Sequence, residues 1–263
     1  MGEVVQSGDP AWKPGDLVEG RCGWQSFAVM PASALRLVDP SLAPPSTALG
    51  VLGMPGMTAY FGMTEIGEPK AGQTVVVSAA AGAVGSAAGQ IARIRGCRVV
   101  GIAGSPDKAR HVVQDLGFDA CIDYKAEPDL AAALRRECPH RIHVYFDNVG
   151  GTTYDAVTAW MALDARIVIC GSIAEYNALG VELGPRRLKE FETWRARLQG
   201  FRVGDYIPRY PEGMAAMAAW IREGKLRYRE TIAEGLENAP AAFIGMLQGR
   251  NVGKQLVRLA RES

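Results

Sequence analysis

The 263-residue chain has almost no net charge and no long apolar run. Lysines and arginines number 29 against 28 aspartates and glutamates, a formal net charge of +1. A chain this close to neutral is poorly suited to nucleic acid or an anionic membrane surface. It also lacks the run of about 18 apolar residues that spans a bilayer, and its start, MGEVVQSGDP, lacks the pattern of a signal peptide. We expect a cytoplasmic protein that binds neither nucleic acid nor membrane.

Cysteines are few, odd in number and widely separated, at positions 22, 97, 121, 138 and 170. This spacing argues against a disulfide framework and offers no Cys-x-x-Cys zinc pattern. We expect reduced thiols and no metal site. The remaining composition, 48% hydrophobic and 22% charged, is that of a globular protein with one large domain or two smaller ones.

From residue 70 onward, short β-branched runs alternate with helical patterns. The sequence predicts strands at 74–78, 97–103, 119–123, 142–147 and 166–170, and helices at 86–95, 106–116, 129–138 and 154–163. Strict alternation with short turns is typical of a parallel sheet covered by helices on both faces. We therefore predict an α/β fold with a doubly wound Rossmann sheet.

Both ends of the chain look less regular than this middle part. The first 55 residues are rich in proline and glycine, with short strands predicted near Val4–Val5, after the turn in WKPGDLVEG, and at 24–30. After Gly171 the pattern returns to mixed structure, with helices at 214–223 and 239–247 and a final strand at 255–259.

The turn after the strand at 74–78 is built of small residues. The segment VSAAAGAVG sets Gly82 and Gly85 at positions of the dinucleotide fingerprint Gly-x-Gly-x-x-Gly, whose first glycine is replaced by Ala80. Gly82 lets a pyrophosphate approach the main chain, and free N–H groups at the helix start meet its charge. An ordinary tight turn would also contain such glycines. The strand–helix–strand setting favours cofactor binding.

The end of the next strand distinguishes two nicotinamide cofactors. An NAD site carries an acid here, about 20 residues beyond the glycine loop, whereas this chain reads GIAGS. Ser105 and Lys108 instead offer a hydroxyl and a cation, which suit a 2′-phosphate. Ser105 could instead be only an N-cap, and Lys108 only a solvated lysine on the helix. The missing acid favours NADPH over NADH.

Four longer segments carry a family resemblance: SAAAGAVGSAAGQIARIRGCRVVGIAGSPDKARHVVQDLGFDACIDYK, YFDNVGG, ICGSIAEYN and ENAPAAFIGMLQGRNVGKQLV. In this order they are similar to the medium-chain dehydrogenase/reductase superfamily. Within it they resemble most the zinc-independent alkenal/one reductases, the group of the prostaglandin and curcumin reductases. The resemblance implies NADPH-dependent reduction of a C=C bond conjugated to a carbonyl, a small apolar α,β-unsaturated substrate, and a homodimer.

The resemblance also implies how the chain divides. It predicts a partial GroES-like substrate domain at 1–60 and an NADP-binding Rossmann domain at 61–204. The residues at 205–263 would complete the Rossmann sheet and return to the substrate domain. Members of the resembled family extend further upstream of the position of Gly2. We therefore expect an incomplete substrate domain, built from both chain ends, with open strand edges.

Cofactor contacts of the resembled family map onto individual residues here. The resemblance assigns the pyrophosphate to Ala81, Gly82, Ala83 and Val84, and the 2′-phosphate to Lys108 and Tyr124. It assigns further contacts to Met54, Thr58, Asn148, Cys170, Gly171, Ser172, Ile173, Tyr176, Phe201, Arg202, Val203 and Asn251. Each could instead be an ordinary turn, cap or strand-end residue, so their joint order carries the prediction.

Tyr176 is the candidate catalytic residue, because the resembled family holds a tyrosine there close to the substrate. Its hydroxyl would stabilise the negative charge that develops on the carbonyl oxygen, or relay a proton. The alternative is that it only positions the nicotinamide ribose. Two other interpretations of the whole chain stay open: a catalytically silent NADPH-binding and dimerising module, and a quinone reductase of the same superfamily.

Overall fold

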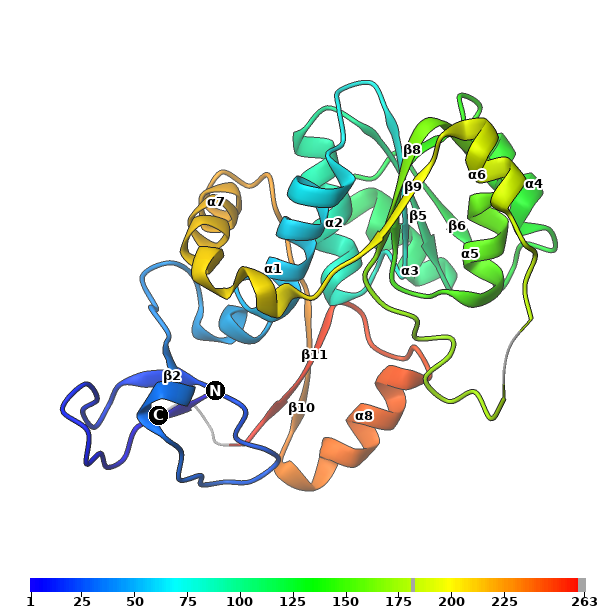
Figure 1. Ribbon diagram of the computed structural model, residues 1–263. Helices are drawn as coiled ribbons and strands as arrows, with labels where there is room; N and C mark the ends of the chain where they lie inside the picture. The colour runs from blue at the N-terminus through cyan, green and yellow to red at the C-terminus, as the bar shows by residue number, and fades with distance from the viewer. Residues whose placement is uncertain (181–182, 260–263) are drawn as a thin grey trace.

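The computed structural model describes residues 1–180 and 183–259, whose largest element is a six-stranded parallel sheet between two helical layers (Figure 1). In spatial order its strands are β6 (Ala120–Asp123), β5 (Arg98–Ala103), β4 (Thr74–Ser78), β7 (Ile142–Asp147), β8 (Met161–Ile169) and β9 (Arg197–Gly200). The chain winds outward from β4 to β6 and then crosses to β7 on the other side. The winding therefore reverses between β4 and β7, where open α/β sheets form their ligand crevice.

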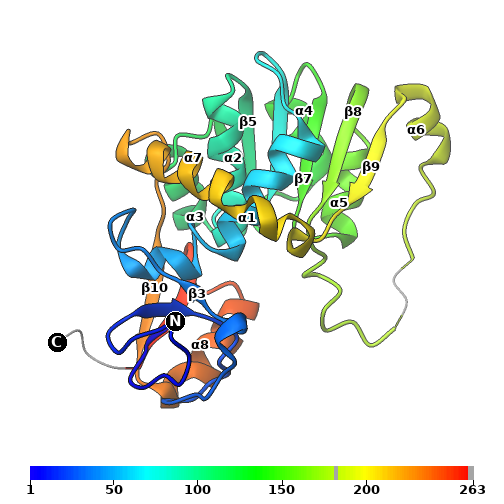
Figure 2. The same cartoon turned by 60° about the vertical axis from the view of Figure 1, so that its left-hand side comes forward.

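The two layers follow from the side-chain alternation of buried strands. Every residue of β4 is buried, and its alternate side chains enter different clusters: Val75 and Val77 on one face, Val76 on the other. The first face carries α1 (Met54–Phe61), α2 (Ala83–Ile94), α3 (Pro106–Arg110) and α7 (Tyr210–Arg222), and the second carries α4 (Leu130–Glu137), α5 (Gly151–Thr158) and α6 (Leu188–Trp194) (Figure 2). Two helices continue as π-helical turns, Gly62–Gly67 after α1 and His111–Asp115 after α3. The doubly wound Rossmann sheet is thus confirmed.

Segments from both ends of the chain form a smaller unit beside the sheet (Figure 1). It comprises the antiparallel strands β1 (Gly2–Glu3), β2 (Leu17–Glu19) and β3 (Arg36–Leu37), the parallel pair β10 (Glu230–Glu234) and β11 (Lys254–Arg258), and α8 (Ala239–Leu247). The rings of Trp24 and Phe243 meet edge to face at 5.8 Å and join the early segment to α8. The expected β-rich unit built from both chain ends is therefore present.

Two local expectations are wrong. Residues 24–30 form no strand: Phe27 and Val29 are exposed, and no described strand pairs with them through main-chain hydrogen bonds. The helix expected at 154–163 instead spans Gly151–Thr158, and β8 already begins at Met161. The early start of β8 has a physical cause, since Met161 pairs with Ile142 of β7 across a register shift that lengthens β8. Among the described helices, none has the length and apolar character needed to cross a bilayer.

Candidate cofactor site

Most of the expected cofactor residues follow the carboxyl ends of the six strands. Residues 81–84 follow β4, Ser105 and Lys108 follow β5, Tyr124 follows β6, Asn148 follows β7, residues 170–173 and Tyr176 follow β8, and residues 201–203 follow β9. Because parallel strands have their carboxyl ends at one edge, the fold gathers these segments along a single rim of the sheet. We call it the carboxyl rim. Met54 and Thr58 lie on α1 instead, and Asn251 precedes β11.

The loop after β4 has the main-chain shape of an anion cradle. Ala79 adopts a left-handed conformation (φ 49°), unusual for a residue with a side chain, and its carbonyl oxygen accepts the N–H of Gly82 at 2.9 Å. A Cβ on Gly85 would stand 2.4 Å from that same oxygen, so only glycine fits there. Gly82 begins α2 without any side-chain cap. The first N–H groups of α2 are therefore available to a pyrophosphate.

A segment from the far end of the chain crosses this loop. The N–H of Gly253 donates to the Ala81 carbonyl at 2.8 Å, and Gly253 forms a parallel bridge with Gly82. The Asn251 side-chain amide donates to the Gly253 carbonyl at 2.9 Å. Asn251 thereby shapes the segment that lies against the cradle.

Ser105 and Lys108 occupy the first turn of α3. The Ser105 hydroxyl is the N-cap and accepts the Lys108 N–H at 3.3 Å, while the Lys108 ammonium donates to the Gly249 carbonyl at 2.6 Å. Burial of the ammonium, together with nearby Lys125, lowers the pKa of Lys108 below its ordinary value. No carboxylate of residues 1–180 or 183–259 forms an ion pair with Lys108. A partly buried cation without a counter-charge fits a phosphate.

Tyr124 stands beside the same turn. Its N–H donates to the Ala103 carbonyl at 3.1 Å, and its hydroxyl lies 3.0 Å from where a Cβ on Gly104 would stand. A side chain at Gly104 would thus displace the tyrosine ring. The hydroxyl of Tyr124 and the ammonium of Lys108 border the end of β5, where a 2′-phosphate is expected.

A buried carboxylate organises the carboxyl ends of β4 and β7. Asp147 is 1% exposed, and its Oδ1 accepts four hydrogen bonds: from the hydroxyls of Ser78 (2.9 Å) and Tyr145 (2.7 Å) and from the N–H groups of Val149 (2.9 Å) and Gly150 (3.1 Å). Sequence reasoning missed this residue. The available signal was an acid at the end of the apolar strand IHVYFD, where an unpaired charge would be costly.

Asn148 is fixed beside Asp147, at the carboxyl end of β7. Its N–H donates to the Ser78 hydroxyl at 2.8 Å, and its side-chain amide donates to the Ser78 carbonyl at 2.7 Å. These bonds join the carboxyl ends of β4 and β7 at the point where the winding reverses. Asn148 therefore lies where the crevice rule places a bound nucleotide.

The loop after β8 is bound to the loop after β7. Its N–H groups at Cys170, Gly171, Ile173 and Ala174 donate to carbonyl oxygens of residues 147–149 over 2.8 to 3.3 Å. Tyr176 reaches back, with its hydroxyl 3.3 Å from where a Cβ on Gly171 would stand, and is 64% exposed. Burial and the nearby Asp147 raise the pKa of the Cys170 thiol to about 12, so it is a neutral packing group.

Two groups of expected residues do not present free side chains at the rim. The Thr58 hydroxyl donates to the Met54 carbonyl at 2.7 Å within α1. The Phe201 ring packs into the core beside Gly62 and Tyr206, so a cofactor contact at this position would use its main chain.

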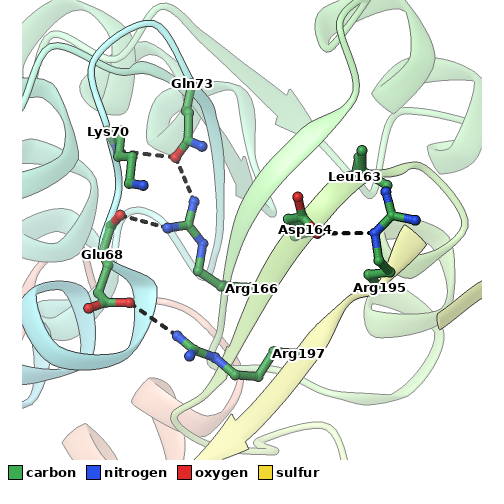
Figure 3. Close-up of a pocket in the computed structure, with 9 residues that line it drawn as sticks. Glu68, Lys70, Gln73, Leu163, Asp164, Arg166, Arg195 and Arg197 are labelled. Atoms are coloured by element: carbon green, nitrogen blue, oxygen red, sulfur yellow. Dashed lines mark hydrogen bonds and ion pairs between the residues drawn. The ribbon is translucent and has the colours of Figure 1, made fainter. Parts of the chain in front are cut away.

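A cavity of about 450 Å³ lies at the opposite, amino end of the sheet (Figure 3). Gln73, which immediately precedes β4, and Arg197, which opens β9, help to line it. Its arginines have partners in the wall of the cavity: Arg166 donates to the Glu68 carbonyl and to the Gln73 side chain at 2.8 and 2.6 Å, and Arg197 meets the Glu68 carboxylate at 3.1 Å. Groups of the protein itself therefore already occupy most of the arginine donors in this cavity.

Known proteins share both the sequence pattern and the fold. The model of the zinc-binding dehydrogenase family matches residues 83–220. The NADPH-dependent curcumin reductase of Escherichia coli is 45% identical over 265 residues, covering 99% of this chain and 76% of the relative. The NADP⁺-dependent 2-alkenal reductase of Nicotiana tabacum is 46% identical over 263 residues, covering 100% of this chain and 76% of the relative. CurA of Vibrio vulnificus, solved in complex with NADPH, superposes with a TM-score of 0.92 at 44% identity and covers 99% of this chain and 78% of that one.

The chain therefore belongs to the zinc-binding dehydrogenase family of medium-chain oxidoreductases. Within that family it is a member of the alkenal/one reductases, which confirms the resemblance seen in the sequence. The family's name refers to zinc. Within residues 1–180 and 183–259, no group of three or more His, Cys, Asp or Glu side chains is placed to hold a metal ion.

Proposed function

We propose that the protein reduces the C=C bond of α,β-unsaturated ketones and aldehydes with NADPH. The observation that carries the cofactor choice is Lys108, a partly buried ammonium with no paired carboxylate among the described residues, at the strand end where an NAD site would hold an acid. The relatives that reduce curcumin and 2-alkenals extend the proposal to the substrate class.

The carboxyl rim offers a contact for each part of the cofactor. The first N–H groups of α2 would bind the pyrophosphate, and Lys108, Ser105 and Tyr124 the 2′-phosphate. Asn148 and the loop 170–176 would flank the nicotinamide, since Asn148 lies where the winding reverses and the loop is hydrogen-bonded to residues 147–149 beside it. The remaining expected contacts, at Met54, Thr58, 201–203 and Asn251, are part of the same proposal.

Tyr176 is the proposed proton or hydrogen-bond donor. Bound NADPH supplies the hydride that adds to the β-carbon of the enone. The C=C π electrons then move toward the carbonyl, where negative charge develops on oxygen. The exposed Tyr176 hydroxyl, in the loop after β8, would donate a hydrogen bond to that oxygen. A proton delivered to the α-carbon from the hydroxyl or from water completes the reduction.

A homodimer is also proposed, on the strength of β9. This strand lies at the edge of the sheet, and all four of its residues are exposed. An open edge strand is a template for pairing with another chain, and a second copy would cover it.

The test is consumption of NADPH, followed by its absorbance, with a simple enone such as but-3-en-2-one. NADH in place of NADPH is the control for the 2′-phosphate. We expect turnover with a clear NADPH preference and a saturated ketone as product. NADPH binding without turnover would instead indicate a silent cofactor-binding module. Turnover of quinones but not of enones would indicate a quinone reductase.

A further inference from the structure

One hydrogen bond joins the two units of the molecule at the expected 2′-phosphate position. Lys108 belongs to α3, in one of the two helical layers that cover the parallel sheet, while Gly249 follows α8 in the smaller unit. The Lys108 ammonium donates to the Gly249 carbonyl at 2.6 Å. A lysine ammonium has three donors, so two of them stay available to an anion.

The direction of this carbonyl depends on a conformation that favours glycine. Gly249 has φ +71° and ends α8 by donating its N–H to the Met246 carbonyl at 2.9 Å. A Cβ on Gly249 would have only the Lys108 Nζ within 4 Å, at 3.5 Å. A side chain would therefore strain the backbone and also approach the Lys108 ammonium, and Gly249→Asn separates the two effects because it adds bulk with less strain.

We propose that Gly249 is a positioning residue that holds the Lys108 ammonium ready for the 2′-phosphate and so helps select NADPH over NADH. The inference rests on the proposed function. A free lysine loses rotamer freedom when it binds a phosphate, and this loss weakens binding. The Gly249 carbonyl fixes the side chain before the cofactor arrives.

The same segment also reaches the pyrophosphate cradle. Four residues after Gly249, the Gly253 N–H donates to the Ala81 carbonyl at 2.8 Å. Residues 249–253 therefore contact the protein at both phosphate positions. The smaller unit thereby takes part in cofactor selection, and its role is not limited to binding the substrate.

The test compares two substitutions at Gly249 with a matched control. Gly249→Val disfavours the left-handed conformation, whereas Gly249→Asn tolerates it and leaves the carbonyl in place. Gly224 has the same position after α7, with φ +69°, and a Cβ there would meet no atom within 4 Å, so Gly224→Val imposes the same strain away from the rim. Calorimetry measures the affinity of each protein for 2′,5′-ADP and for 5′-AMP, which differ by the 2′-phosphate.

We expect Gly249→Val to lower the affinity for 2′,5′-ADP roughly tenfold and to leave the affinity for 5′-AMP unchanged. A loss of this size is typical when a charge-assisted contact is weakened. Gly249→Asn should restore most of the affinity, and Gly224→Val should change neither ligand. An equal loss for both ligands, or the same loss in Gly224→Val, would overturn the inference. A wild-type protein that binds both ligands equally would contradict the proposed NADPH preference itself. If Lys108→Met abolishes the difference but Gly249→Val does not, the proposed function stands and the Gly249 inference fails.

Discussion

The two ends of the parallel sheet differ in how their polar groups are satisfied. At the amino end, the cavity of about 450 Å³ contains two ion pairs, in which Arg197 binds Glu68 and Arg195 approaches Asp164 at 3.5 Å. At the carboxyl rim, the helix start at Gly82 has no side-chain cap and Lys108 has no carboxylate partner among the described residues. An uncapped helix start beside Lys108, and not cavity size, distinguishes the proposed functional end.

Hydrogen bonds hold the loops that form the carboxyl rim in place. Asp147 receives four hydrogen bonds, and the loops after β7 and β8 are joined by main-chain bonds. Because these hydrogen bonds fix the loops, donors at the rim such as the first N–H groups of α2 are already in position before a cofactor binds. Such preorganisation favours binding. We therefore expect substitutions at the two ends to have different consequences for cofactor binding.

The largest effect is expected for Asp147→Ala. It leaves two buried hydroxyls and two N–H groups without their acceptor, so the free energy of unfolding should fall by about 3 kcal/mol or more. Urea unfolding measures the loss. Asp164→Asn is the control, because Asp164 is an exposed acid at the amino end and asparagine tolerates its left-handed conformation (φ 56°), so stability should change by less than about 0.5 kcal/mol. Equal losses at the two acids would contradict the difference between the ends.

Lys108→Met should come next. Loss of its charge should lower kcat/KM for NADPH by roughly 30- to 100-fold, about 2–3 kcal/mol, and leave kcat/KM for NADH unchanged. Lys70→Met, at the amino-end cavity, is the matched control and should leave both values unchanged. A drop for both cofactors with Lys108→Met would argue for a structural role.

Lys108 also predicts a pH dependence. Burial and Lys125 lower the pKa of Lys108, so its ammonium loses its proton at a lower pH than an exposed lysine does. The cation that binds the 2′-phosphate is then lost as the pH rises. The ratio of NADPH to NADH affinities should therefore fall with increasing pH in the wild type and stay flat in Lys108→Met.

Tyr176→Phe is expected to have a smaller effect on the chemical step. Removing the hydroxyl should lower kcat for enone reduction about tenfold, roughly 1.4 kcal/mol, without changing the affinity for NADPH. Tyr210→Phe, at the start of α7, controls for the loss of a tyrosine hydroxyl. Weaker NADPH binding with an unchanged kcat would mean that Tyr176 only positions the cofactor.

The smallest effect is expected for Arg166→Met at the amino end. Arg166 donates to the Glu68 carbonyl and to Gln73, but its Nε is buried without a partner among the described residues. An apolar replacement removes that unsatisfied group, so stability should change by less than about 1 kcal/mol. Cofactor affinity should not change. A loss of NADPH affinity would show that the two ends are coupled.

Local sequence patterns predicted the parts of the fold that local physics decides. The run TVVVS is apolar on both faces and became the buried strand β4, and Ser105 caps α3 as expected. The strand expected at 24–30 failed because a strand requires a neighbour to pair with, which its own residues do not encode. The start of β8 at Met161 depends on pairing with Ile142, again a contact between distant segments.

The candidate site shows the same division. The glycines at 82 and 85 and the missing acid after β5 could be found in the sequence, because motif spacing reports on them. The bond from Lys108 to Gly249 spans 141 residues, and the Ser78–Asp147 bond spans 69, so neither has a local signal. Such contacts become visible only once the strands are in order.

Amide hydrogen exchange with and without NADPH is the most direct test of whether the carboxyl rim binds the cofactor. We predict slower exchange along the rim when NADPH is bound, at residues 79–85, 104–108, 147–151, 170–176 and 249–253. No change is expected around the amino-end cavity, at residues 68–73, 163–166 and 195–197. Protection centred on the cavity, with the rim unaffected, would contradict a cofactor site at the carboxyl rim.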